Sequence, residues 1–152
     1  MKVKPGDLSD PQVVELLRLH LQGMHSCSPP GHSFALDVSG LEQPDITFLA
    51  IWDEDTLLSI GAMRELAPTH GELKSMRTRS DQLRRGAATL MLVSLLDLAI
   101  TRGYRRVSLE TGSGEEFEPA LALYRKHGFR EGEAFGGYVA SDFNQFFHLD
   151  LA

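Results

Sequence analysis

The sequence has little cysteine and no long hydrophobic run. Cys27 is the one cysteine among 152 residues, so no disulfide can form within the chain, and we expect a reducing, cytoplasmic location. No apolar stretch is long enough to cross a bilayer, and residues 1–12 lack the apolar core of a secretory signal. The sequence therefore predicts a protein that does not associate with a membrane.

Positive charge is also scarce. The 15 lysines and arginines are outnumbered by 21 aspartates and glutamates, which gives a formal net charge of −6. An acidic chain has no general positive field for phosphate backbones, so we expect no nucleic-acid partner and only local anion sites. The histidines lack the clustered spacing of metal ligands, which predicts no metal site; they are His20, His25, His32, His70, His127 and His148.

The remaining composition is typical of one globular domain, 1–152, with 42% hydrophobic and 24% charged residues. Apolar periodicity and turn formers predict an N-terminal strand, then strands at 46–53, 56–66, 71–78 and 106–111, and a closing pair around 137–139 and 146–151. They predict helices at 11–24, within 33–41, at 87–100 and at 118–127. Helices placed among strands in this order predict a mixed α/β sheet.

Two of these helices have informative sequences. Asp10 and Pro11 suit the N-cap and first position of the first helix. Its expected apolar face consists of Val13, Val14, Leu17, Leu21 and Met24. The segment 87–100 is apolar nearly all round, which predicts packing on several sides.

A basic stretch, RRGAAT, immediately precedes and opens this apolar helix. The first backbone N–H groups of a helix have no partner within the helix, and the helix dipole adds positive potential there, so the junction can bind a phosphate. Gly86, Ala87 and Ala88 would let a phosphate approach the backbone, while Arg84 and Arg85 would add charge. The alternative is a solvated basic turn before a closely packed helix.

Common nucleotide motifs do not fit this junction. A Walker A loop needs G-x-x-x-x-G-K-[ST], and a dinucleotide-binding fingerprint needs G-x-G-x-x-G, of which only one glycine is present here. These mismatches argue against nucleotide hydrolysis and dinucleotide binding.

Two segments together resemble the GNAT superfamily of acetyl-CoA-dependent N-acetyltransferases. Gly86 and Ala88 fill the last two positions of that family's [Q/R]-x-x-G-x-[G/A] loop, with Leu83 at the first position. The segment ALALYRKHGF, residues 120–129, resembles the family's A-x-x-L-Y-x-x-x-G-F element. The resemblance implies a GNAT-like, mostly antiparallel central sheet of about six to seven strands flanked by helices, and a homodimer is plausible for this fold.

The resemblance also implies where acetyl-CoA would bind. The strand ending at Met76, Arg77 and Thr78 would pair its backbone with the pantetheine arm and diverge from the strand at 107–111 to open a V-shaped slot. The family's pyrophosphate loop corresponds here to Arg84, Arg85, Gly86, Ala87, Ala88 and Thr89.

Three residues are candidates for the chemistry that the resemblance implies. Tyr124 is the candidate general acid for the leaving thiolate, because a phenol with a reference pKa of about 10 is protonated at neutral pH. Its alternative role is a core aromatic. Glu72 and Glu110 are candidate general bases that would take a proton from an ammonium acceptor, and either could instead be an exposed residue or an ion-pair partner.

The sequence thus predicts transfer of an acetyl group to a primary amine, most simply that of a small molecule. A protein or peptide amine is the enzymatic alternative, and a catalytically inactive module that binds coenzyme A is another. A nucleic-acid module built on the arginines at 77, 79, 84 and 85 is disfavoured, because no aromatic residues are interleaved with them.

Overall fold

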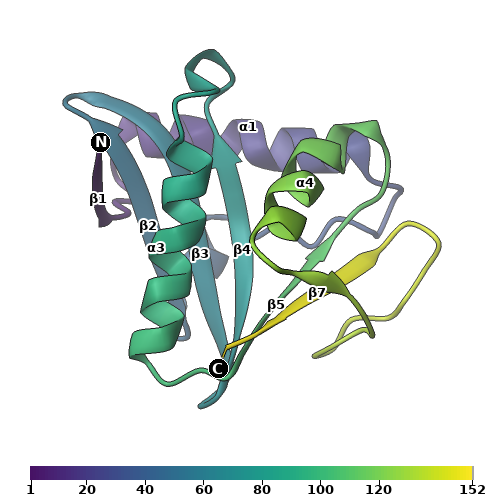
Figure 1. Cartoon of the computed structure of the whole chain (residues 1–152). Helices are drawn as coiled ribbons and strands as arrows, with labels where there is room; N and C mark the ends of the chain where they lie inside the picture. Colours follow the sequence, from purple (N-terminus) through teal and green to yellow (C-terminus); the bar gives the residue numbers. More distant parts are fainter. Residues whose placement is uncertain (152) are drawn as a thin grey trace.

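A seven-stranded sheet organises the computed structural model, which describes residues 1–151 (Figure 1). In chain order the strands are β1 (Lys2–Pro5), β2 (Ile46–Asp53), β3 (Thr56–Ala67), β4 (His70–Thr78), β5 (Arg106–Thr111), β6 (Arg130–Glu131) and β7 (Gln145–Asp150). Their spatial order is β1-β2-β3-β4-β5-β7-β6, and every neighbouring pair is antiparallel except β4 with β5. The predicted mixed, mostly antiparallel sheet is confirmed.

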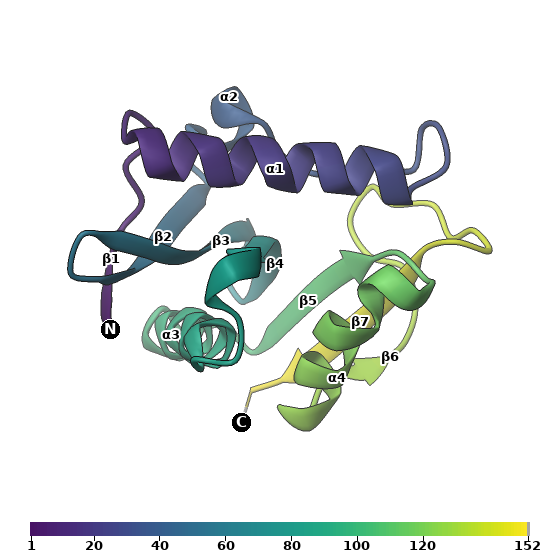
Figure 2. The same ribbon diagram turned by 90° about the horizontal axis from the view of Figure 1, so that it is seen from above.

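Helices cover both faces of the sheet (Figure 2). Helices α1 (Pro11–Cys27) and α2 (Val38–Leu41) lie on one face, and α3 (Ala87–Thr101) and α4 (Glu118–Lys126) lie on the other. One apolar cluster joins α1 and α2 to the sheet, and a larger one joins α3 and α4 to its opposite face. The predicted order of helices and strands is therefore correct.

Helix α1 begins as its sequence predicts, but its buried face is rotated slightly. The Asp10 carboxylate accepts hydrogen bonds from the backbone N–H groups of Gln12 and Val13, which caps the helix. Val14 is 40% exposed, and the buried residues are Val13, Leu16, Leu17 and His20. A histidine thus lies on the face that packs against the sheet.

The prediction that α3 packs on several sides is wrong. The residues it buries lie against the sheet: Ala87, Met91, Leu92, Leu95 and Ala99. Val93 is 38% exposed and Ile100 is 60% exposed. A helix on the outside of a two-faced sheet has one neighbouring layer, so its outer apolar residues remain at the surface.

The prediction of a strand around 137–139 is also wrong. These residues form a loop, and β7 pairs instead with the short strand β6, at Arg130↔His148 and Glu131↔Phe147. The hydroxyl of Tyr138 donates a hydrogen bond to the buried Glu72. This contact positions the segment as a loop, so its backbone does not pair with a strand. A homodimer through the last strands stays a prediction; β7 is paired on both sides, and β6 is the outer strand.

The junction between β4 and β5 positions the site. The two parallel strands pair only at His70↔Arg106, Gly71↔Val107 and Glu72↔Ser108, and they then diverge into the V visible in Figure 1. Beyond this point β4 contains a bulge, because Ala62 pairs with Lys74 while Ile60 pairs with Arg77. The bulge includes Ser75, whose φ of 57° lies in the left-handed region. The predicted divergence of the two strands is confirmed.

Gly71 leaves no room for a larger residue at the closed end of the V. A Cβ atom there would lie 2.7 Å from the sulfur of Met63 and 2.7 Å from a ring carbon of Tyr104. We expect Gly71→Ala to lower the free energy of unfolding by about 1–3 kcal/mol, because the ring cannot move freely in a packed core. Gly137→Ala is the control, since a Cβ at Gly137 meets no atom within 4 Å among residues 1–151. Equal urea-unfolding free energies for the two variants would contradict this account.

Candidate active site

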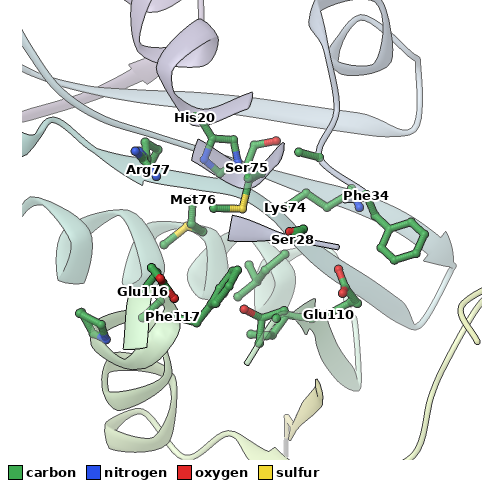
Figure 3. A pocket seen from close by; sticks show the side chains of 18 of the residues that line it. His20, Ser28, Phe34, Lys74, Ser75, Met76, Arg77, Glu110, Glu116 and Phe117 are labelled. Atoms are coloured by element: carbon green, nitrogen blue, oxygen red, sulfur yellow. The ribbon is translucent and has the colours of Figure 1, made fainter. Parts of the chain in front are cut away.

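A cavity of about 610 Å³ runs from the N-terminus of α3, along β4, to the loop between α1 and α2. Residues from both faces of the sheet line it, including Leu83 and Ala88 near α3, Met76 to Thr78 on β4, Glu110 on β5, Tyr124 on α4, and His32 to Ala35. Figure 3 shows His20, Ser75 and Arg77 along one side, with Glu110, Glu116 and Phe117 along the other. The open V between β4 and β5 thus joins the two faces in one cavity.

The end of the cavity next to α3 can accept an anion. Gly86, at the N-cap, has a φ of 85°, and a Cβ there would meet no atom within 4 Å in the described part of the chain. No side chain of residues 1–151 caps the helix, so its first N–H groups remain available. Ala88 lines the cavity, and Leu83 lines it with 57% of its surface exposed. These features suit a phosphate group.

The arginines of the basic stretch lie outside this cavity. The guanidinium of Arg85 forms an ion pair with Asp53 and donates to Gln82, and exposed Arg84 has a left-handed backbone with a φ of 64°. Among the residues suggested for cofactor binding, Met76, Arg77, Thr78 and Ala88 line the cavity, whereas Arg84, Arg85, Gly86, Ala87 and Thr89 do not. At the latter positions, backbone N–H groups rather than side chains are available to a phosphate.

Tyr124 lies in the wall that α4 contributes. Its side chain is 7% exposed and packs edge-on against Phe129, with ring centroids 5.7 Å apart. Burial raises the pKa of Tyr124 to about 12, because the phenolate would lose its solvation. The phenol therefore keeps its proton at neutral pH and can donate it.

Glu110 lies on β5 where the V has opened. The pKa of Glu110 is raised to about 7, mainly by burial; the positive charge of Lys74 lowers it and the negative charge of Glu72 raises it. A carboxyl group with such a pKa can accept a proton and release it near neutral pH.

Glu72 does not line the main cavity but a second, adjacent cavity of about 350 Å³. Its carboxylate accepts hydrogen bonds from Tyr138 Oη at 2.5 Å and Lys74 Nζ at 3.3 Å, and its side chain is 2% exposed. The two carboxylates that the sequence suggested as alternatives therefore line different cavities. Glu110 lines the main cavity, and Glu72 lines the second cavity.

Some polar groups in these cavities could not have been found from the sequence. Buried polar atoms normally have hydrogen-bond partners, yet six in residues 1–151 have none. Five of the six belong to residues that line the two cavities: His20, Ser33 and Ser75 in the main one, and Arg64 and Glu72 in the second. Burial and the charge of Arg77 lower the pKa of His20 to about 4, so this imidazole is neutral.

In residues 1–151 no group of three or more histidine, cysteine, aspartate or glutamate side chains is arranged to hold a metal ion. Over the same residues, no helix combines the length and apolarity needed to cross a membrane.

Comparison with known proteins identifies the family. The family model "Acetyltransferase (GNAT) family" matches residues 13–129. The uncharacterized N-acetyltransferase YedL of Escherichia coli is 44% identical over 149 residues, which are 98% of this chain and 94% of that protein. The uncharacterized N-acetyltransferase YsnE of Bacillus subtilis is 46% identical over 138 residues, 91% of each chain. The chain belongs to the GNAT acetyltransferase family.

Solved structures share the GNAT fold. A putative acyl-CoA N-acyltransferase from Klebsiella pneumoniae superposes with a TM-score of 0.82 at 22% identity, over 99% of this chain and 97% of that one. An acetyltransferase of Bacillus subtilis, solved with coenzyme A, gives a TM-score of 0.73 at 16% identity over 99% of each chain. Family membership makes this GNAT protein an acyltransferase that depends on acetyl-CoA.

The pKa of Glu110 gives a test by unfolding. Folded GNAT protein retains this proton up to about pH 7, whereas the unfolded chain releases it near the ordinary value of 4.5. The free energy of unfolding should therefore fall by about 3 kcal/mol as pH rises from about 4.5 to about 7. Glu110→Gln should lack this loss, so the difference between the two urea-unfolding profiles isolates Glu110. If the unfolding free energies of the wild type and of Glu110→Gln changed in parallel across this pH range, the pKa of Glu110 would be ordinary.

Proposed function

We propose that the protein transfers the acetyl group of acetyl-CoA to a primary amine of a small molecule, by direct attack within the main cavity. The observation that supports this most strongly is the pairing of two groups in one cavity. Glu110, with a pKa of about 7, can accept a proton, and Tyr124, with a pKa of about 12, can donate one.

The chain offers suitable groups for acetyl-CoA, which would supply an activated acetyl thioester. The first N–H groups of α3, from Ala87 to Thr89, would hold the pyrophosphate, because they lack a side-chain cap and Gly86 leaves open space beside them. Beyond Glu72, the edge of β4 that faces β5 has no strand partner among residues 1–151, so its backbone groups can pair with the amides of the pantetheine arm.

Each protein group then has one task in the transfer. Glu110 takes the proton that an ammonium acceptor must lose before its nitrogen can attack. A backbone N–H in the segment from Met76 to Thr78 donates to the acetyl carbonyl oxygen as negative charge develops there. Tyr124 donates its proton to the sulfur as the carbon–sulfur bond breaks, and the second proton, which the nitrogen loses as the amide forms, restores the phenol. Glu72 takes no proton in this scheme, because Tyr138 and Lys74 already engage its carboxylate.

The enclosure of the acceptor end favours a small molecule. The loop between α1 and α2 lines this end with Ser28, His32, Ser33 and Phe34, and Phe34 packs edge-on against Tyr138 at 5.2 Å between ring centroids. A peptide amine would have to enter past these residues.

Removal of the Tyr124 hydroxyl tests the proposed function directly. In a thiol-release assay with acetyl-CoA and a panel of amines, amino acids, polyamines and peptides, we expect turnover of a small amine by the wild type. Tyr124→Phe should lower kcat about 100-fold or more, the usual contribution of a general acid, with little change in acetyl-CoA binding.

Tyr104→Phe is the matched control, because Tyr104 is buried, donates to Glu65 and lines neither cavity. Its kcat should stay within a few-fold of wild type. Unchanged kcat in Tyr124→Phe would refute the general acid. Acetyl-CoA binding without transfer to any acceptor would indicate the inactive module, and transfer only to peptides would indicate the protein-amine alternative.

Ala88→Asp tests the position of the pyrophosphate. A carboxylate at this cavity-lining position should repel the phosphates and weaken coenzyme A binding about 10-fold or more, measured by calorimetry. The same carboxylate should stabilise the free protein slightly, because acidic residues are favourable at a helix N-terminus. Ala140→Asp adds the same charge on an exposed loop and should leave affinity unchanged. Equal affinities of the two variants would place the pyrophosphate elsewhere.

A further inference from the structure

The second cavity contains a cationic group whose hydrogen-bonding capacity is unused. Arg64, on β3, lines this cavity, and its side chain is 28% exposed. Its Nε lies 3.6 Å from Asp45 Oδ2, and its Nη1 lies 3.8 Å from Glu72 Oε1. Both distances exceed those of a normal hydrogen bond, and Nε is buried without a partner in the described part of the chain. Nε itself is enclosed, so the donors that Arg64 can offer a ligand are the terminal N–H groups of its partly exposed guanidinium.

Lys74 provides a second cation beside it. Its side chain is 7% exposed, and Nζ donates to Tyr138 Oη at 2.8 Å and to Glu72 Oε2 at 3.3 Å. An ammonium has three donors, so one remains for a ligand. Lys74 also lines the main cavity, so this residue is common to both cavities.

The charges that line the second cavity do not balance. Arg64 and Lys74 are positive, and Glu72 is the one acidic residue among the described residues that line it. Asp45, at 48% exposed, is not part of the lining, but it forms an ion pair with Arg64 Nε at 3.6 Å. The lining residues alone therefore carry an excess of one positive charge, which the solvent-exposed Asp45 offsets in part and a monoanionic ligand would neutralise.

We propose that the acceptor is an amine that carries a carboxylate, and that Arg64 and Lys74 bind this carboxylate in the second cavity. The inference rests on the proposed function, because it requires the amine of the same molecule to reach Glu110 in the main cavity. Arg64 can contact Glu72 with one edge of its guanidinium and the ligand with another, since its five N–H groups lie in one plane. The apolar side chains of Phe34, Leu36 and Leu66 would contact the carbon skeleton beside the carboxylate.

A carboxylate suits this cavity better than other anions or neutral polar groups. Its two oxygens match the parallel N–H groups of a guanidinium. The two negative charges of a phosphate dianion would exceed the positive charge available in the second cavity, and Glu72 in its lining would repel them. A neutral amide would leave the excess charge unpaired in a partly buried place, which is costly.

Matched pairs of acceptors test the inference without any substitution. The panel consists of α-, β- and γ-amino acids and their carboxamides, together with polyamines and aminoglycosides, in the thiol-release assay. We expect kcat/KM of an acid to exceed that of its amide by about 10- to 100-fold, the worth of a hydrogen bond to a charged group. The amino group of an α-carboxamide is the less basic of the pair and loses its proton more easily, so this bias opposes the expected result.

The variant Arg64→Gln should remove this preference. For the preferred acid, KM should rise about 10- to 100-fold with a smaller change in kcat, while kcat/KM of the amide stays within about 2-fold. Arg64→Lys keeps the charge without the planar donors and should fall between Arg64→Gln and the wild type. Arg105→Gln is the control, because Arg105 is exposed and lines neither cavity.

The outcomes distinguish this inference from the proposed function. Equal or better use of the amide, or reaction with carboxylate-free amines alone, would overturn the carboxylate subsite and leave amine acetylation intact. An equal loss for acid and amide in Arg64→Gln would assign Arg64 a structural role and would also overturn it. If no amine on any panel is acetylated, the proposed function itself fails. Because the acid-to-amide ratio of the wild type needs no variant, a failure of Arg64→Gln to fold does not prevent the test.

Discussion

The early end of the β4–β5 pairing is the constraint on which the site depends. After Glu72↔Ser108 the two parallel strands separate, although each remains paired on its other side with β3 or β7. A backbone edge of β4 is thereby left without a strand partner in the interior of the sheet. Such an edge is costly unless something pairs with it. The main cavity follows the gap from α3 to the loop between α1 and α2, along this unpaired edge.

The charged residues of the site lie on the two strands that border the gap, Glu72 and Lys74 on β4 and Glu110 on β5. Glu110 is raised in pKa by burial and by Glu72, and Lys74 limits the rise. Lys74 and Tyr138 hold the carboxylate of Glu72, and burial raises the pKa of Tyr138. The carboxylate of Glu72 is therefore held in a hydrogen-bond network, while the pKa of Glu110 lies near neutral pH. Two similar side chains differ in their interactions because their surroundings differ, which composition alone does not reveal.

The distribution of unpartnered polar atoms supports the same division. A buried polar group without a hydrogen-bond partner lowers the stability of a folded protein, so such groups are rare in protein cores. Here, within residues 1–151, they concentrate at the two cavities, in His20, Ser33, Ser75, Arg64 and Glu72. Two apolar clusters fill the space between α3 and the sheet and between α1 and the sheet. Within residues 1–151, the deficit of hydrogen bonds therefore coincides with the two cavities.

The sequence by itself determined the features that depend on neighbouring residues. These include the order of helices and strands, the Asp10 cap and the start of α3 at Gly86, because caps, turns and apolar periods are local. Tertiary structure decided what depends on residues far apart in the chain. The Ser75 bulge opposite β3, the ion pair of Arg85 with Asp53 and the hydrogen bond from Tyr138 to Glu72 arise from contacts across the fold. The hydrogen bond from Tyr138 to Glu72 explains why residues 137–139 form a loop and not the predicted strand. A buried hydrogen bond to a carboxylate contributes more than the weak local preference of these residues for a strand.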